Sequence, residues 1–176
     1  MNPRLQFCLA AVVLLAFLGC ALASVAPADV LSRSSLAQHF VSIVSIVLPL
    51  EQYGQRTPWP EVAKLYYAVV WLSFPFALIA AWEFLRARDG KSDGLLFRPR
   101  ERLGVVPRLV LILLAPLWLF LAYVGYRYWG GNTRLFDFAT SFWQMSLLGI
   151  LAPVLTALAL ALGVGSLVKA LLGRFL

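Results

Sequence analysis

Four long segments without a charged residue dominate this chain of 176 residues. They cover residues 5–28, 65–82, 109–126 and 138–168. An α-helix rises about 1.5 Å per residue, so even the shortest segment extends about 27 Å, close to the ~30 Å hydrocarbon thickness of a bilayer. The composition agrees, since 61% of the residues are hydrophobic, whereas soluble domains are about 45–50% apolar. The sequence therefore predicts an all-α, polytopic integral membrane helix bundle with four transmembrane helices, forming one domain over residues 1–176.

The predicted spans are about residues 5–26, 62–86, 107–129 and 138–170. Pro60 and Glu61 mark the start of the second span, because proline is tolerated in a first helical turn and a carboxylate suits the positive end of the helix dipole. The last charge-free segment would extend about 46 Å as one helix, longer than the bilayer core. We therefore expect it to tilt, or to place its first turn in the membrane interface.

A different pattern occupies residues 32–49. Its polar side chains recur every three or four residues and fall on one face of a helix, while apolar side chains cover another face. The polar set is Ser35, Gln38, His39, Ser42 and Ser45. This pattern predicts an amphipathic helix on the outer face of the membrane, lying flat on the outer leaflet or packed against the bundle.

A basic connector between the second and third spans determines the predicted orientation. Its cationic residues are Arg86, Arg88, Lys91, Arg98, Arg100, Arg102 and Arg108. Cytoplasmic loops carry the excess of lysine and arginine, so we expect the loop at residues 87–106 and both chain termini to lie in the cytoplasm. The composition, rich in leucine, alanine, arginine and tryptophan, is typical of a protein of a bacterial inner membrane.

The first segment has a second interpretation, as a cleaved signal peptide. Arg4 would then form the positive N-terminal region, residues 7–22 the apolar core, and Ala21-Leu22-Ala23 the cleavage site. In that case the mature N-terminus would lie outside. The sequence leaves both interpretations open.

Anionic lipid headgroups are the expected partners of the basic connector, because each lysine or arginine near an anionic leaflet contributes about 1 kcal/mol of attraction. A cytoplasmic protein partner is the second interpretation. We do not expect nucleic-acid binding, because Phe97 is the one aromatic residue in this loop that could stack on a base.

Three prolines lie inside predicted spans: Pro75, Pro116 and Pro153. Each lacks a backbone N–H and predicts a helix kink. Transporters use such breaks to build binding sites at the middle of the membrane, although prolines are also ordinary in membrane helices.

Small residues recur at four-residue spacing in the last span, at Ala157, Ala161 and Gly165. Such residues allow helix backbones to approach closely, so they predict a helix-contact face. The neighbouring helix could belong to another subunit or to the same chain.

No pattern in the sequence predicts catalytic, cofactor-binding or metal-binding residues. His39 is the sole histidine, and one histidine without companion ligands does not make a zinc site. Cys8 and Cys20 both lie in the first span, about 18 Å apart along a helix, too far for a disulfide. The sequence therefore favours a non-enzymatic subunit, assembly factor or scaffold of a larger membrane complex, interacting with lipids and other membrane subunits. The alternative is a small oligomeric channel or transporter with proline-kinked helices.

Overall fold

A computed structural model describes residues 3–53, 57–86, 105–128 and 142–172. The secondary structure of these residues is helical, which confirms the predicted all-α class. The helices are α1 (Pro3–Val25), α2 (Val30–Arg33), α3 (Ser35–Ser45), α4 (Pro60–Trp71), α5 (Phe74–Arg86), α6 (Val105–Tyr128), α7 (Phe142–Gly149) and α8 (Leu151–Leu172). Four helical stretches are long and apolar enough to cross a membrane: Pro3–Val25, Pro60–Leu85, Arg108–Tyr128 and Gln144–Leu171.

Two of these stretches are interrupted. The second breaks between α4 and α5, where the N–H groups of Leu72 and Ser73 donate to carbonyls three residues back, at 3.1 and 3.0 Å. Pro75 follows in the first turn of α5 and has no N–H to continue the α-helical pattern. The last stretch breaks at Ile150, between α7 and α8 and three residues before Pro153. Pro116, by contrast, lies inside the continuous helix α6.

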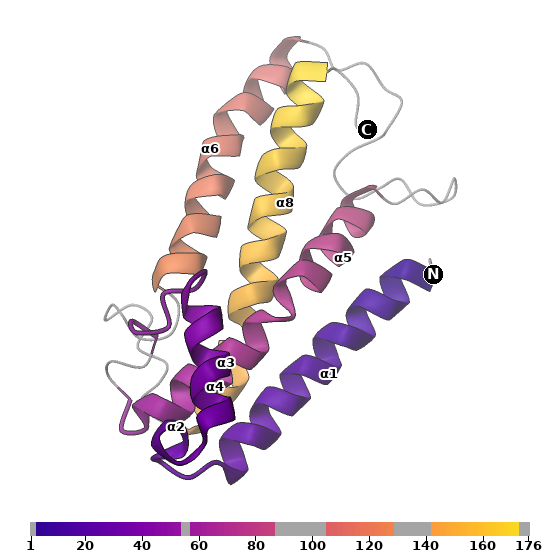
Figure 1. The fold of residues 1–176 in the computed structure, drawn as a ribbon. Helices are drawn as coiled ribbons and strands as arrows, with labels where there is room; N and C mark the ends of the chain where they lie inside the picture. The colour runs from indigo at the N-terminus through magenta and orange to yellow at the C-terminus, as the bar shows by residue number, and fades with distance from the viewer. Residues whose placement is uncertain (1–2, 54–56, 87–104, 129–141, 173–176) are drawn as a thin grey trace.

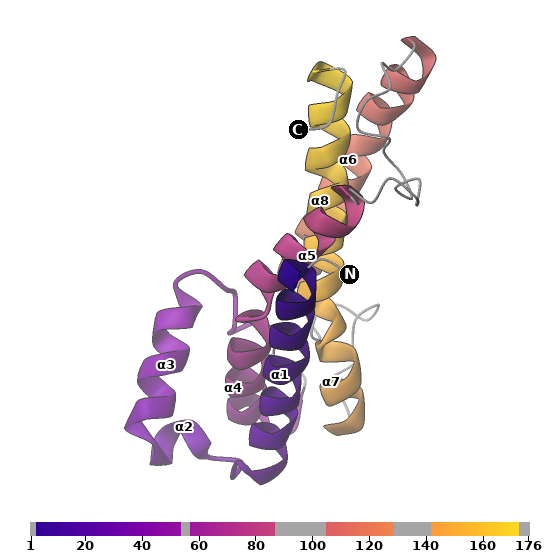
Figure 2. The ribbon, with the colours of Figure 1, turned by 90° about the vertical axis from the view of Figure 1, so that its right-hand side faces the viewer.

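The four long stretches lie side by side in a row (Figure 1). α1 packs against α4 and α5, α5 packs against α8, and α8 packs against α6. Seen along the row, the long helices overlap one another, while α2 and α3 stand out to one side (Figure 2). The described helices therefore form an open row rather than a closed bundle. A closed bundle is not required in a membrane, because lipid tails are as apolar as leucine side chains.

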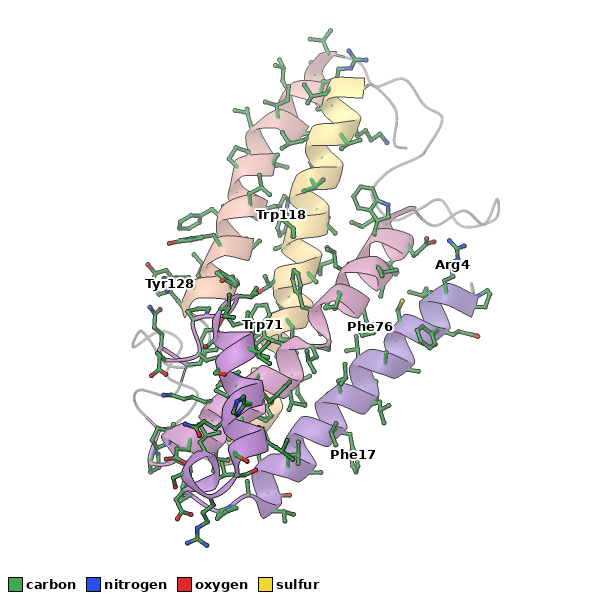
Figure 3. The ribbon with its side chains drawn as sticks, viewed as in Figure 1. Arg4, Phe17, Trp71, Phe76, Trp118 and Tyr128 are labelled. Atoms are coloured by element: carbon green, nitrogen blue, oxygen red, sulfur yellow. The ribbon has the colours of Figure 1, made fainter. Side chains whose placement is uncertain are left out.

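Two apolar clusters hold the row together. The larger joins α4 to α1, α3, α7 and α8 around four fully buried residues, Tyr53, Tyr66, Tyr67 and Val70. The smaller joins α5, α6 and α8 around Leu85, Ala161 and Leu162. Figure 3 shows Trp118 of α6 beside α8 in this second cluster, whereas Phe17 points away from the row at the edge formed by α1.

The amphipathic segment predicted at residues 32–49 is divided into α2 and α3, and α3 ends at Ser45. The division falls at Ser34, whose hydroxyl oxygen accepts the N–H of Ala37 at 3.3 Å and so caps the start of α3. α3 packs against α4 through a strip that includes the buried Val41. Of its remaining apolar residues, Leu36 and Ile43 are 83% and 64% exposed. Of the two predicted positions, the structure therefore shows α3 packed against the membrane helices.

Candidate functional site

Most of the predicted basic connector lies outside the described residues, including Arg88, Lys91, Arg98, Arg100 and Arg102. Arg86 is the last residue of α5, and Arg108 lies in the first turn of α6. The Nε atom of Arg108 is buried and has no hydrogen-bond partner among the described residues. The role of the connector therefore stays a prediction.

The small residues of α8 lie inside the row. Ala157 and Ala161 are 0% and 1% exposed, and Gly165 is also buried. Ala161 belongs to the cluster that α8 forms with α5 and α6. The residues of this face are therefore covered by helices of the same chain, which leaves little of it for another subunit.

α6 presents the opposite situation, because it packs almost wholly against α8. Its inner strip is small and buried, with Ala115 fully buried and Ala122 6% exposed. Gly125 continues this strip, and a Cβ there would lie 2.4 Å from Thr156 Oγ1 of α8. In the most apolar part of this candidate span, 17% of the residues are buried. The outer face of α6 carries large exposed apolar side chains: Leu109, Val110, Leu113, Leu117, Phe120 and Leu121.

An aromatic cluster joins α4 to the C-terminal end of α6. Tyr53 stacks on Trp71 with ring centroids 6.2 Å apart, and Trp71 meets Tyr126 edge-on at 5.9 Å. The hydroxyl of Tyr53 donates to the carbonyl of Tyr126, and the hydroxyl of Tyr126 donates to the carbonyl of Val47. Burial raises the pKa of Tyr53 well above its ordinary value. These bonds tie the segment after α3 to the end of α6.

Tyr66 holds α1, α4 and α7 together. Its hydroxyl donates to the carbonyl of Ser146 at 2.9 Å. Gly149 makes room for its ring, because a Cβ there would lie 2.6 Å from Tyr66 Cε1. Gly19 of α1 makes room for Val70 of α4, because a Cβ there would lie 2.6 Å from Val70 Cγ2. The close approach of the three helices therefore depends on the absence of side chains at these two positions.

A polar cleft opens between α2, α3 and the start of α4. It has a volume of about 350 Å³. Its lining comprises Leu31, Ser32, Gln38, Val41, Ser42, Ser45, Glu51, Glu61 and Lys64. Part of the predicted polar face of α3 therefore lines this cleft between α3 and α4.

The charged residues of the cleft are held by defined contacts. Glu61 Oε2 accepts the N–H groups of Leu31 and Ser32 at 2.7 and 3.2 Å, so one carboxylate oxygen satisfies the first turn of α2. Lys64 Nζ pairs with Glu51 Oε2 at 2.6 Å. Nearby, the guanidinium of Arg33 bonds the carboxylate of Asp29 at 2.6 Å and holds the pKa of Asp29 below its ordinary value.

Sequence reasoning missed this cleft. It placed Glu61 at the start of its own helix, and the structure keeps it there, but its carboxylate serves a different helix, α2. The signal in the sequence was the spacing of Gln38, Ser42 and Ser45, which recur on one face of α3. Charged residues follow this segment closely in the chain. No motif with fixed spacing connects these positions.

Comparisons with protein-family models, with curated proteins and with solved structures find no match to this chain.

Proposed function

We propose that this chain is a non-enzymatic subunit or assembly factor of a larger membrane complex, inserted in a bacterial inner membrane with its basic connector and both termini in the cytoplasm. The observation that carries the proposal is the position of α6 at the edge of an open row. Its buried strip meets one neighbour, α8, and its opposite face is left uncovered by the described part of the chain.

The chemistry of that face indicates the kind of partner. Leu113 is 75% exposed and Phe120 is 59% exposed, and both lie on the side of α6 opposite the buried Ala115. Association of helices in a membrane depends on van der Waals packing rather than on escape from water. A transmembrane helix of another subunit can extend the row here, in the way that α8 already packs against the other side of α6.

The basic connector supplies the cytoplasmic side of the proposal. Its arginines and lysines would dock on anionic headgroups beside the complex. Anionic lipids and neighbouring membrane subunits are therefore the proposed partners, and a catalytic role is not part of the proposal.

Purification of the full chain from its native membrane tests this function. In a mild detergent, the protein should migrate on a native gel within a larger assembly and should bring the same membrane proteins with it in each preparation. A variant with Leu113→Ser and Phe120→Ser should lose these proteins while keeping its helix content. A monomer free of associated proteins, combined with no protein adducts after crosslinking in cells, would contradict the proposal.

A small oligomeric channel or transporter is the second candidate. It is favoured by the helix breaks beside Pro75 and Pro153, which lie in two spans that are in contact. Flux into liposomes should fall in variants Pro75→Ala and Pro153→Ala. Unchanged flux in both variants would remove the basis of this candidate.

A further inference from the structure

The serines of the polar cleft present hydrogen-bond acceptors. Ser32 Oγ donates its hydrogen to the carbonyl of Asp29 at 2.8 Å. Ser42 Oγ donates to the carbonyl of His39 at 2.8 Å, and Ser45 Oγ donates to the carbonyl of Ser42 at 2.7 Å. A hydroxyl has one hydrogen and two lone pairs, so each serine retains acceptor capacity for a ligand.

The charged groups of the cleft add to this acceptor surface. Glu61 uses Oε2 for the start of α2, and its second oxygen, Oε1, accepts no hydrogen bond from the described residues. Lys64 is already paired with Glu51. Two carboxylates against one ammonium leave the lining with a formal charge of −1. The cleft therefore favours a ligand that is cationic and rich in N–H donors.

We propose that this cleft binds a primary ammonium group, carried either by the headgroup of an ethanolamine phospholipid or by a small soluble amine. An ammonium provides three N–H donors on one positive centre. Glu61 would take the charge, while the hydroxyl oxygens of Ser42 and Ser45 and the amide oxygen of Gln38 would accept the remaining hydrogens.

Other cations fit this lining less well. A quaternary ammonium has no N–H group and is usually bound by aromatic faces, and the described residues that line the cleft include no aromatic side chain. A metal ion calls for several ligating side chains, and the described residues include no group of three or more His, Cys, Asp or Glu side chains placed to hold one. The expected preference is therefore for ethanolamine over choline.

The surroundings of the cleft bring both sources of the ammonium within reach. Val41 and Leu31 line its apolar part. A phospholipid could place its headgroup in the cleft with its chains along these residues. A soluble amine could enter from the water side. This inference does not depend on the proposed subunit role.

Binding measurements on the full chain in nanodiscs made of choline phospholipid test the proposal. Free ethanolamine is titrated by calorimetry, with choline as the competing cation. Retention of ethanolamine phospholipid against choline phospholipid is measured separately by native mass spectrometry. Ethanolamine, free or in phospholipid, should bind at least about tenfold tighter than its choline counterpart, because hydrogen bonds to a charged group are lost with choline.

Variants locate the binding in the cleft. Glu61→Gln keeps an oxygen for the N–H groups of α2 but removes the charge, and should weaken ammonium binding at least about tenfold. Ser42→Ala leaves the cap of α2 untouched and should weaken binding about two- to tenfold. Asp29→Asn is the matched control, since it removes a nearby carboxylate that does not line the cleft, and it should bind as the unaltered protein does.

The outcomes distinguish the two sources. Retention of the phospholipid without binding of free ethanolamine assigns the cleft to a lipid headgroup, and binding of free ethanolamine shows that the soluble group suffices. Either result supports the proposal if Ser42→Ala or Glu61→Gln weakens the binding. Equal binding of choline, unchanged binding in both cleft variants, or no binding of either ethanolamine form would overturn the proposal.

Discussion

Replacing Gly149 with alanine should destabilise the junction of α1, α4 and α7. The new Cβ would lie 2.6 Å from Tyr66 Cε1, 2.8 Å from its hydroxyl oxygen and 3.1 Å from its Cζ. The Tyr66 ring has little room to retreat. It is fully buried, and Tyr67 meets it edge-on at 5.1 Å.

Overpacking of this kind costs about 1–3 kcal/mol. The better helix propensity of alanine recovers up to ~1 kcal/mol at a helical position, so the net loss should be about 1–2 kcal/mol. Gly163→Ala is the comparison, because its Cβ would lie 2.8 and 2.9 Å from Leu119 Cδ2 and Cγ and 3.3 Å from the Leu119 backbone N. Rotation of the leucine side chain relieves the two shortest contacts and a shift of a few tenths of an ångström relieves the third, so this variant should lose less stability than Gly149→Ala.

Unfolding in mixed micelles by titration with sodium dodecyl sulfate, followed by circular dichroism, measures both variants. A double-mutant cycle with Tyr66→Leu assigns the cause, because leucine lacks the ring atoms that clash. In that background Gly149→Ala should cost close to nothing. If Gly149→Ala unfolds as the unaltered protein does, or if it loses the same stability with leucine at position 66, then a clash with the Tyr66 ring is not the cause.

Three further predictions concern other parts of the chain. Tyr66→Phe removes the bond to the Ser146 carbonyl and should cost about 1 kcal/mol of unfolding free energy in the same titration; no loss would mean that this bond is replaced by another. Thr156→Val should be neutral or stabilising by about 1 kcal/mol, because Thr156 Oγ1 is buried without a hydrogen-bond partner among the described residues; a clear loss of stability would reveal a partner for this hydroxyl. Ser92→Cys, in a background with Cys8→Ala and Cys20→Ala, should resist an impermeant thiol reagent in intact spheroplasts and react after lysis; labelling before lysis would place the basic connector outside.

The spans could be predicted because charge-free length is a sufficient signal for a membrane helix. Three candidate helices begin and end within two residues of the predicted ranges. The fourth, Gln144–Leu171, begins six residues after the predicted start at residue 138, and residues 138–141 lie outside the described residues. The interruption before Pro75 was indicated by the proline itself, but its form, a tight turn at Leu72 and Ser73, depends on local backbone bonds that the residue types do not determine.

The arrangement of the spans could not be predicted in the same way. Hydrophobicity does not show which face of a membrane helix meets protein and which meets lipid, because both are apolar. Ala157 and Ala161 were recognised as a contact face, yet the sequence could not identify the neighbour as α5 or α6 of the same chain. The polar cleft was missed because Gln38, Glu51 and Glu61 become neighbours through packing of separate elements.

The exposed face of α6 is central to the proposed role in a complex, and a photo-crosslinking amino acid at Leu113 tests it most directly. Leu113 is 75% exposed, whereas Ala115, two residues along the same helix, is fully buried and serves as the control position. Irradiation of intact cells should yield a discrete protein adduct of higher mass from position 113 and none from position 115. Lipid adducts alone from position 113, with no protein attached, would contradict the account.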